Sequence, residues 1–392
     1  MGYIEKRGQN SYRLVVNAGF DTDGSRIRRT KTVKCKNQTE AKIELAKFVT
    51  EIEAGEYITP EKMTFAAFII EWKAKYASKQ LEASTYETYK TLLENQILPK
   101  FGHKRMDQIN TMQILNFLES LSQEGMRSDG KPGTLSSATI QFYHRVLKNI
   151  FSRAVDWKVI KENPVANIKK PKVDSKRAKV YTEEQVGMLM SYIANEDPKW
   201  KMIITLAIST GMRRGEILAI EWNHVDLEKR KIHIQQSLTY TKEKGYTFKE
   251  PKTKNSIRTI SLSPIVTEQL RQYKLYKNKQ KLRLGDKWKG NERNLLFSTW
   301  DGQPMYPSSI SSWWRKRLKM YGLPQITFHE LRHTSATLLI NEGVHMKTIS
   351  ARLGHSKIGI TMDLYGHALE SADEAAANKF DHLFQQKKQE NI

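Results

Sequence analysis

The sequence predicts a multidomain, mainly α-helical protein that carries small antiparallel β-sheets. Its 392 residues are enough for two or three domains of ordinary size. Most apolar residues recur at helical spacing, whereas short alternating runs rich in β-branched and aromatic residues occur near the N-terminus and in the middle of the chain. Hydrophobic residues make up 39% of the chain, which indicates a globular rather than a disordered protein.

The charge of the chain indicates a polyanionic partner. The formal net charge is +23 and the pI is about 9.7, so nucleic acid is the first expectation and an acidic membrane surface the second. We expect no membrane span, because no apolar run approaches the ~18–20 residues that a span needs. We also expect no signal segment and no myristoyl anchor. Cys35 is the only cysteine, which excludes an internal disulfide and a cysteine zinc cluster and fits a reducing cytoplasm.

Residues 1–57 predict a three-stranded sheet followed by one helix. Ser11–Phe20 alternates in polarity, residues 21–24 supply turn chemistry, and Arg26–Lys36 is a second run of strand character. Asn37–Gly55 has the apolar spacing of a helix.

The strands of this first segment are basic. Residues 1–36 contain nine basic and three acidic side chains. A small sheet braced by a helix can lie in a DNA groove, and the alternative is a solvated basic surface on an accessory domain. Because the charge of the whole chain favours DNA, the candidate DNA-binding residues are Arg13, Arg26, Arg28, Arg29 and Lys31.

Residues 61–168 predict a domain of four or five helices. The segments with helical periodicity are Thr64–Ser78, Ser84–Leu98, Thr111–Gln123 and Ser136–Val159. We expect Pro99 and Gly102 to interrupt them. The basic residues of this domain are scattered, so a solvated helical bundle is the alternative to a DNA-facing role.

Residues 169–181 predict a basic linker, because they lack apolar periodicity and contain a proline. Beside DNA, Lys176, Arg177 and Lys179 would follow the phosphates, and as a bare charge run they would be merely solvated.

Residues 182–392 form the largest predicted domain. Thr182 begins a helix, and the nearly all-apolar Trp200–Ser209 predicts a buried one. One small antiparallel sheet is expected from Lys231–Tyr240, Gly245–Lys249 and Ser256–Leu262. Further helices are expected at Pro264–Arg283, Ser308–Tyr321, Phe328–Glu342, His345–Leu353 and Ala368–Gln386.

The last part of the chain contains groups suited to attack on a phosphodiester. His329 and Arg332 lie one helical turn apart, and His355 and Tyr365 follow. Arginine can bind the phosphate oxygens through two parallel hydrogen bonds, and histidine exchanges a proton near neutral pH. A tyrosine nucleophile forms a phosphotyrosyl ester that keeps the energy of the broken bond. Each residue alone is more often structural, so the order and spacing of the set carry the inference.

Other phosphoryl chemistries have weaker support. The sequence has no carboxylate cluster with metal spacing, no His-Glu-x-x-His motif and no glycine loop that would cradle a phosphate. Readings as a metal-dependent nuclease or an NTPase are therefore weak.

Five motifs together resemble the tyrosine recombinase (phage integrase) family, in that family's order. They are T-G-M-R-R-G-E-I-L from Thr210, P-K-T-K-N-S-I-R-T-I from Pro251, H-E-L-R-H-T from His329, L-G-H-S from Leu353 and Y-G-H from Tyr365. Residues 182–385 resemble the catalytic domain and the helical segment resembles the SAM-like core-binding domain. The N-terminal strands resemble the arm-binding domain of integrases from temperate phages and integrative conjugative elements.

The resemblance implies a role for each matching residue. Arg213 and Arg332 would clamp the scissile phosphate, and Tyr365 would be the nucleophile. His329 would help to move the tyrosine proton, and His355 would donate a hydrogen bond to the phosphate.

Two further positions have supporting or less certain assignments. Glu216 resembles a supporting acidic residue that orients Arg213. A lysine of the strand hairpin is the family's general acid, for which we select Lys252, with Lys249 and Lys254 close by.

The resemblance also implies an activity. It is that of a site-specific recombinase that cleaves and rejoins double-stranded DNA through a 3′-phosphotyrosyl intermediate, integrating a mobile element such as a viral genome, with excision left open. No metal or other cofactor is implied. The expected partners are core-type and arm-type attachment sites, a homotetramer, and accessory DNA-bending and excision proteins, in the nucleoid-containing cytoplasm of a bacterial host.

Three matters stay open at this point. A type IB topoisomerase-like nicking-closing enzyme would use the same chemistry, and a non-catalytic DNA-binding regulator could use the same scaffold. The last expected helix, with its apolar face, could dock on a neighbouring protomer or on its own domain.

Overall fold

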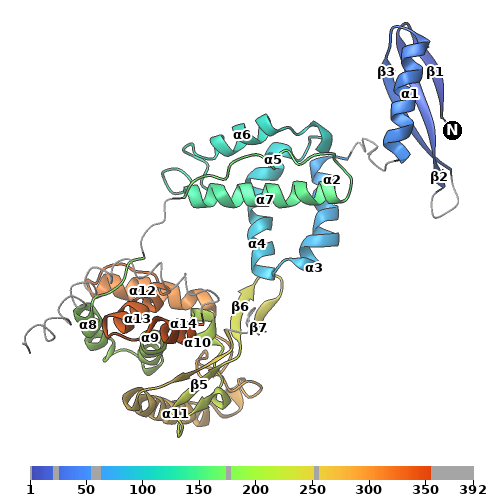
Figure 1. Cartoon of the computed structure of the whole chain (residues 1–392). Coiled ribbons are helices and arrows are strands. Elements are labelled where there is room, and N and C mark those ends of the chain that lie inside the picture. Colours follow the sequence, from blue (N-terminus) through green and yellow to red (C-terminus); the bar gives the residue numbers. More distant parts are fainter. Residues whose placement is uncertain (1, 21–25, 54–62, 174–177, 251–255, 355–392) are drawn as a thin grey trace, which may run out of the picture. The chain divides into compact units, whose positions relative to one another are not determined.

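The computed structural model describes residues 2–20, 26–53, 63–173, 178–250 and 256–354. The chain divides into two compact units, Met1–Asp174 and Ser175–Ile392. Helices dominate the described residues, and every paired strand is antiparallel in a small sheet (Figure 1). The predicted fold class is therefore confirmed.

The N-terminal part of the first unit is a sheet with one helix along it (Figure 1). Its strands are β1 (Gly2–Gly8), β2 (Ser11–Phe20) and β3 (Arg26–Lys34), in the order β1-β2-β3, and the helix is α1 (Gln38–Glu53). Alternate residues of a strand point to opposite faces, so Leu14 and Val16 both pack against Phe48 of α1. Burial of one sheet face fixes the register of the strands.

The rest of the first unit is helical, with a core rich in aromatic side chains. Its helices are α2 (Phe65–Trp72), α3 (Ser78–Gln80), α4 (Ala83–Leu92), α5 (Leu98–Phe101), α6 (Thr111–Ser120) and α7 (Ser137–Asp156). The 20-residue α7 buries one side, from Ile140 to Ala154, in this core. Its N-cap, Ser136, accepts a hydrogen bond from the Thr139 amide, as the sequence pattern of a helix start requires.

One expected interruption of this helical part is wrong. Pro99 lies inside a helical stretch, because α4 continues through a π-helical turn at Leu93–Ile97 into α5. Proline cannot donate a backbone hydrogen bond, and it is tolerated here because it occupies the first turn of α5 after the wider π turn.

The second unit is built around α9. Its helices are α8 (Glu183–Ile193), α9 (Pro198–Thr210), α10 (Arg214–Leu218), α11 (Pro264–Leu284), α12 (Pro307–Met320), α13 (Glu330–Asn341) and α14 (Met346–Leu353). Residues 202–207 of α9 are all buried, and α8, α10, α11 and α13 pack on it. A helix that is apolar on every side is buried on every side.

The expected single sheet of this unit is wrong. Lys231–Tyr240 forms two strands in different sheets, β5 (Lys231–Ile234) and β6 (Ser237–Thr241). The first sheet has the order β4-β5-β8 and the second pairs β6 with β7; the other strands are β4 (Val225–Asp226), β7 (Gly245–Lys249) and β8 (Arg258–Ser261). Between β5 and β6, the side chain of Gln236 donates to the Ala219 carbonyl and to Glu221. Gln236 is therefore directed back into the unit, and the pairing of β5 ends before it.

Both ends of the expected linker are held by neighbouring helices. In the first unit, Gln141 of α7 donates to the Pro171 carbonyl. In the second, the Lys179 amide donates to Glu330 and the Tyr181 amide to Thr334, both on α13. The domain boundaries themselves stay a prediction.

Two further expectations concern the helices. The helix expected at Ala368–Gln386 lies outside the described residues. Within the described part of the chain, no helix has the length and apolar character needed to cross a membrane.

Candidate active site

The end of α9 brings two of the candidate residues together. Gly211 ends the helix with a φ of 65°, a conformation that favours glycine, and a Cβ there would collide with Leu353 of α14. Its carbonyl accepts a hydrogen bond from Nη1 of Arg332 at 2.7 Å. Because Arg213 follows two residues later, at the start of α10, one backbone turn holds both arginines in the same site.

A buried carboxylate, Glu216, is the centre of the site. It is 3% exposed and accepts hydrogen bonds from the Arg213 amide at 2.9 Å and from Arg213 Nη1 at 2.7 Å. Arg258 of β8 donates to the other side of the same carboxylate through Nη2 at 2.8 Å and Nη1 at 3.2 Å. Burial by itself raises the pKa of Glu216, but these hydrogen bonds and charges outweigh it and lower the pKa below its ordinary value. Glu216 is therefore ionised and holds two guanidinium groups.

Arg332 is a buried cation with unused hydrogen-bonding capacity. It is 2% exposed, and its Nη2 has no acceptor among the residues that the structure describes. Burial, and next the charge of Arg213, lower its pKa to about 9, so it is still charged at neutral pH. A buried, charged donor without a partner is costly, and an anion bound at this position would satisfy it.

The end of α14 is attached to the two other arginines. Arg213 Nη2 donates to the Gly354 carbonyl at 3.2 Å, and Arg258 Nε donates to the Arg352 carbonyl at 2.7 Å. Gly354 has a φ of 68°, and a Cβ there would lie 2.9 Å from Arg258 Nη1. The Leu-Gly step of the L-G-H-S motif is therefore required by close packing and by backbone conformation.

His329 precedes α13 on the same side as Arg332. Part of its surface is exposed, but desolvation by the surrounding protein lowers its pKa to about 4, and the charges of His333, Arg332 and Arg213 act in the same direction. The ring of His333 packs edge-on against it, with 5.1 Å between the ring centroids. The imidazole of His329 is therefore neutral at physiological pH and can accept a proton.

Of the remaining candidates for this site, only Lys249 lies within the described residues. Lys252, Lys254, His355 and Tyr365 lie outside the described residues. Lys249 ends β7, shortly before the two other lysines in the sequence. The structure therefore brings Arg213, Glu216, His329 and Arg332 together and leaves the nucleophile and the general acid as predictions.

Sequence reasoning missed two residues that contact this group, Arg258 and His333. Arg258 belongs to the quoted S-I-R-T-I run, and its place on a strand beside an α-helical site gave no periodic signal. His333 follows His329 by four residues, the spacing of one helix face, and that spacing could have revealed it.

The basic residues of the N-terminal sheet do not share a face. Arg13 and Asn17 alternate along β2 with Leu14 and Val16, which face α1, so they point to the opposite side of the sheet. Arg28 pairs with Asn17 across the strands and therefore lies on that opposite side as well. Arg29 and Lys31 are opposite Val16 and Leu14, on the side of α1, and Lys31 Nζ lies 5.6 Å from the centre of the Phe48 ring. The side chain of Arg26 lies outside the described residues, as do Lys176 and Arg177. The alternation of side chains along a strand thus places neighbouring basic residues, such as Arg28 and Arg29, on opposite faces of the sheet.

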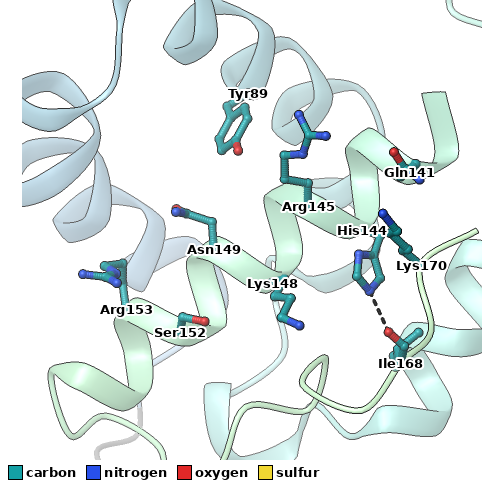
Figure 2. A pocket seen from close by; sticks show the side chains of 10 residues that line it. All are labelled: Tyr89, Gln141, His144, Arg145, Lys148, Asn149, Ser152, Arg153, Ile168 and Lys170. Atoms are coloured by element: carbon teal, nitrogen blue, oxygen red, sulfur yellow. Dashed lines mark hydrogen bonds between the residues drawn. The ribbon is translucent and has the colours of Figure 1, made fainter. Parts of the chain in front are cut away.

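A second candidate site is a basic groove of about 520 Å³ along α7 in the first unit (Figure 2). Its described lining has four basic side chains and no carboxylate: Tyr89, Gln141, His144, Arg145, Lys148, Asn149, Ser152, Arg153, Ile168 and Lys170. Figure 2 shows His144 with its Nε2 against the Ile168 carbonyl, 3.0 Å away. The basic residues of this domain were expected to be scattered, but Arg145, Lys148 and Arg153 are among the groove residues that recur every three or four positions along one face of α7.

No candidate metal site was found in the described parts of either unit. Within residues 2–354, outside the undescribed gaps, His, Cys, Asp and Glu side chains do not gather in groups of three or more that could hold an ion.

Comparison with known proteins places this geometry in a family. Residues 179–371 match the model of the phage integrase family, and residues 64–122 match the phage integrase N-terminal SAM-like domain. The chain is 28% identical to the tyrosine recombinase XerC-like protein of Caldanaerobacter subterraneus subsp. tengcongensis, over 97% of this chain and 98% of the relative. It is 26% identical to the ICEBs1 integrase of Bacillus subtilis, over 97% and 99% of the two chains.

Solved structures show the same fold. A structure of the Tn1549 transposon integrase in complex with a circular intermediate DNA has a TM-score of 0.65 and 22% identity, over 81% of this chain and 99% of the other. A lambda integrase tetramer bound to a Holliday junction has a TM-score of 0.56 and 18% identity, over 93% and 94%.

The lowered pKa of His329 leads to a testable prediction. In the DNA-free protein we expect its ring to stay neutral until the pH falls to about 4, because burial and the neighbouring cations disfavour the imidazolium. An NMR titration of the histidine side chains measures this, with a model peptide as the reference for an imidazole of ordinary pKa, about 6.5. A midpoint near that reference value for His329 would contradict the lowered pKa and the charged surroundings described above.

Proposed function

The chain belongs to the phage integrase family, and from this premise we propose which of its residues cut and rejoin DNA. It is a tyrosine recombinase of the kind that carries out site-specific recombination of mobile elements. The assignment of residues, the DNA contacts and the assembly state are the parts that we propose.

The phosphate clamp consists of Arg213 and Arg332. The observation that carries this proposal is the buried Nη2 of Arg332, which has no acceptor among the described residues. Arg213 lies beside it with a side chain that is 38% exposed, and two of its nitrogens are already fixed by Glu216 and Gly354. A scissile phosphate would give the free donors of both guanidinium groups their acceptors. It would also offset the repulsion between two cations, which is otherwise unfavourable.

The reaction follows from this clamp. The Tyr365 oxygen attacks phosphorus, its bond to phosphorus forms, and the bond from phosphorus to the 5′ oxygen breaks. His329, neutral in the DNA-free protein, accepts the tyrosine proton. Lys252 gives a proton to the leaving 5′ oxygen, and His355 donates a hydrogen bond to a non-bridging oxygen. The charge that develops on the phosphate oxygens is stabilised by the two arginines, which are positioned before the reaction.

Rejoining uses the same groups in reverse. The phosphotyrosyl ester keeps the energy of the phosphodiester, so a 5′ hydroxyl from another strand can attack it without a nucleotide cofactor. This property distinguishes strand exchange from hydrolysis, and it is the reason that the nucleophile is a tyrosine rather than a water molecule.

DNA would be held by both units. The basic groove on α7 offers Arg145, Lys148 and Lys170 to the phosphates, without a carboxylate in its described lining. In the N-terminal sheet, the face away from α1 offers Arg13 and Arg28. Together with the excess of positive charge over the whole chain, these surfaces favour binding that depends strongly on salt.

The assembly and its sites follow the same reasoning. We propose a homotetramer on core-type sites, with arm-type sites bound by the N-terminal sheet, acting on DNA in the bacterial cytoplasm. The described relatives include an integrase of an integrative element and a transposon integrase bound to DNA. Accessory bending and excision proteins would set the direction of the reaction.

The nucleophile is tested with a nicked suicide substrate that contains the cognate core site. Wild-type protein should form a covalent complex, whereas Tyr365→Phe should form none, because it lacks the attacking oxygen. The measurement is the fraction of labelled DNA that migrates with denatured protein. An equal covalent yield from Tyr365→Phe would assign the nucleophile to another residue.

The general acid is tested by changing the leaving group. Lys252→Ala should slow cleavage of ordinary DNA by about 10²–10⁴-fold, which is the usual contribution of a proton donor. A substrate with a 5′-bridging sulfur at the scissile position should restore the rate, because a thiolate leaves without protonation. Lys249→Ala and Lys254→Ala are the matched controls, and rescue of one of them instead of Lys252→Ala would move the role to that residue.

The groove on α7 is tested through the salt dependence of binding. Replacing Arg145 or Lys148 with alanine should reduce the slope of log affinity against log salt concentration by about 0.9 for each phosphate contact that is lost. Lys161→Ala is the control, because Lys161 is exposed in the same unit but does not line the groove. A slope that stays at the wild-type value in the groove variants would show that DNA does not occupy it.

A further inference from the structure

Arg258 is a buried arginine for which the reaction above has no role. It lies at the start of β8, and its side chain is only 6% exposed. All three of its nitrogens donate hydrogen bonds, to Glu216, to the Arg352 carbonyl and to the Ser256 carbonyl. Four of its five N–H donors are used within the protein and the side chain is buried, so Arg258 acts through its neighbours.

These bonds join three separate parts of the site. Glu216 is on α10, next to Arg213, and Arg352 is in the last turn of α14. Ser256 directly follows, in the sequence, the segment 251–255 that contains Lys252, the proposed general acid. The fork of Arg258 therefore ties α10, the end of α14 and the backbone of Ser256 to one another. A lysine, with a single point charge, could not make the same set of planar contacts.

The charges explain why this second arginine is needed. Glu216 faces Arg213 on one side and Arg258 on the other, with distances of 2.7 and 2.8 Å. With Arg258 present, two guanidinium groups share the negative charge of Glu216. Arg213, Arg258 and Glu216 together then keep a net positive charge. Without Arg258, the lone pairs of the buried carboxylate that face it would be unpaired, and Arg213 would be the only cation in contact with them among the described residues. Arg213 would then be drawn toward Glu216, and less of its charge would face a phosphate.

From this geometry we propose that Arg258 is a positioning residue for DNA cleavage: it shares Glu216 with Arg213 and fixes the end of α14, so that Arg213 keeps its free donors directed at the scissile phosphate. The proposal rests on the function proposed above. It assigns Arg258 no contact with DNA, and its effect passes through Arg213, Glu216 and the backbone of Arg352 and Gly354.

The test compares two scissile groups in single-turnover cleavage of the suicide substrate. One substrate has the ordinary phosphate, and the other has a methylphosphonate, which is neutral and does not need the charge of Arg213. Arg258→Met should slow cleavage of the phosphate by about 10²-fold, the typical loss when a stabilising donor is misplaced. Arg258→Lys should recover part of this rate. With the methylphosphonate, the difference between wild type and Arg258→Met should nearly vanish.

A matched control separates positioning from general loss of structure. Arg317→Met removes another partly buried ion pair of the same unit, between Arg317 and Glu196, away from the site, and it should cleave both substrates at the wild-type rate. Equal slowing of Arg258→Met on both substrates would mean that the change damages the unit as a whole, and this overturns the proposal. An Arg258→Met variant as fast as wild type on the phosphate overturns it as well, while the proposed function stands. If wild-type protein forms no covalent complex, the proposed function fails, and this inference fails with it.

Discussion

The catalytic unit depends on one buried carboxylate and the two guanidinium groups that it holds. Glu216 is nearly inaccessible to water and remains ionised only because Arg213 and Arg258 surround it. An unpaired charge at this depth would be strongly destabilising, whereas a paired one fixes its partners in direction. The position of Arg213, the end of α14 and the start of β8 all follow from this arrangement. The hydrophobic packing of the unit holds these three elements next to the carboxylate.

The site also concentrates positive charge around the buried Arg332. Burial and the proximity of Arg213 make the charged form of Arg332 less favourable, and the same field keeps His329 neutral. One environment thus produces both a cation that lacks an acceptor among the described residues and an imidazole ready to accept a proton. These are the two functions that a metal-independent attack on a phosphodiester requires from the protein, apart from the nucleophile and the acid.

The two units have separate cores and carry different candidate sites. The helical part of the first unit has a core of its own, rich in aromatic residues, and leaves the polar face of α7 for a basic groove. The second unit has a separate core around α9. Because each unit buries its own apolar surface, the segment that joins them does not need to contribute to either core beyond its ends, such as Ile168 and Tyr181.

The sequence by itself determined the fold class and the family, and it predicted the residues of the site. Helical periodicity located α7, α9 and α13 closely, since an amphipathic or all-apolar pattern depends only on local spacing. The order of the motifs identified Arg213, His329 and Arg332 as members of one site. Tertiary structure decided what local spacing cannot encode. It ended the first strand of 231–240 at Ile234, carried a helix through Pro99, and divided the basic residues of β2 and β3 between two faces. It also revealed Arg258, whose partners are 42 and 94 positions away in the chain. A contact over such a separation forms only when the chain has folded, because it depends on the meeting of a strand, a short helix and a helix end rather than on any repeat in the sequence.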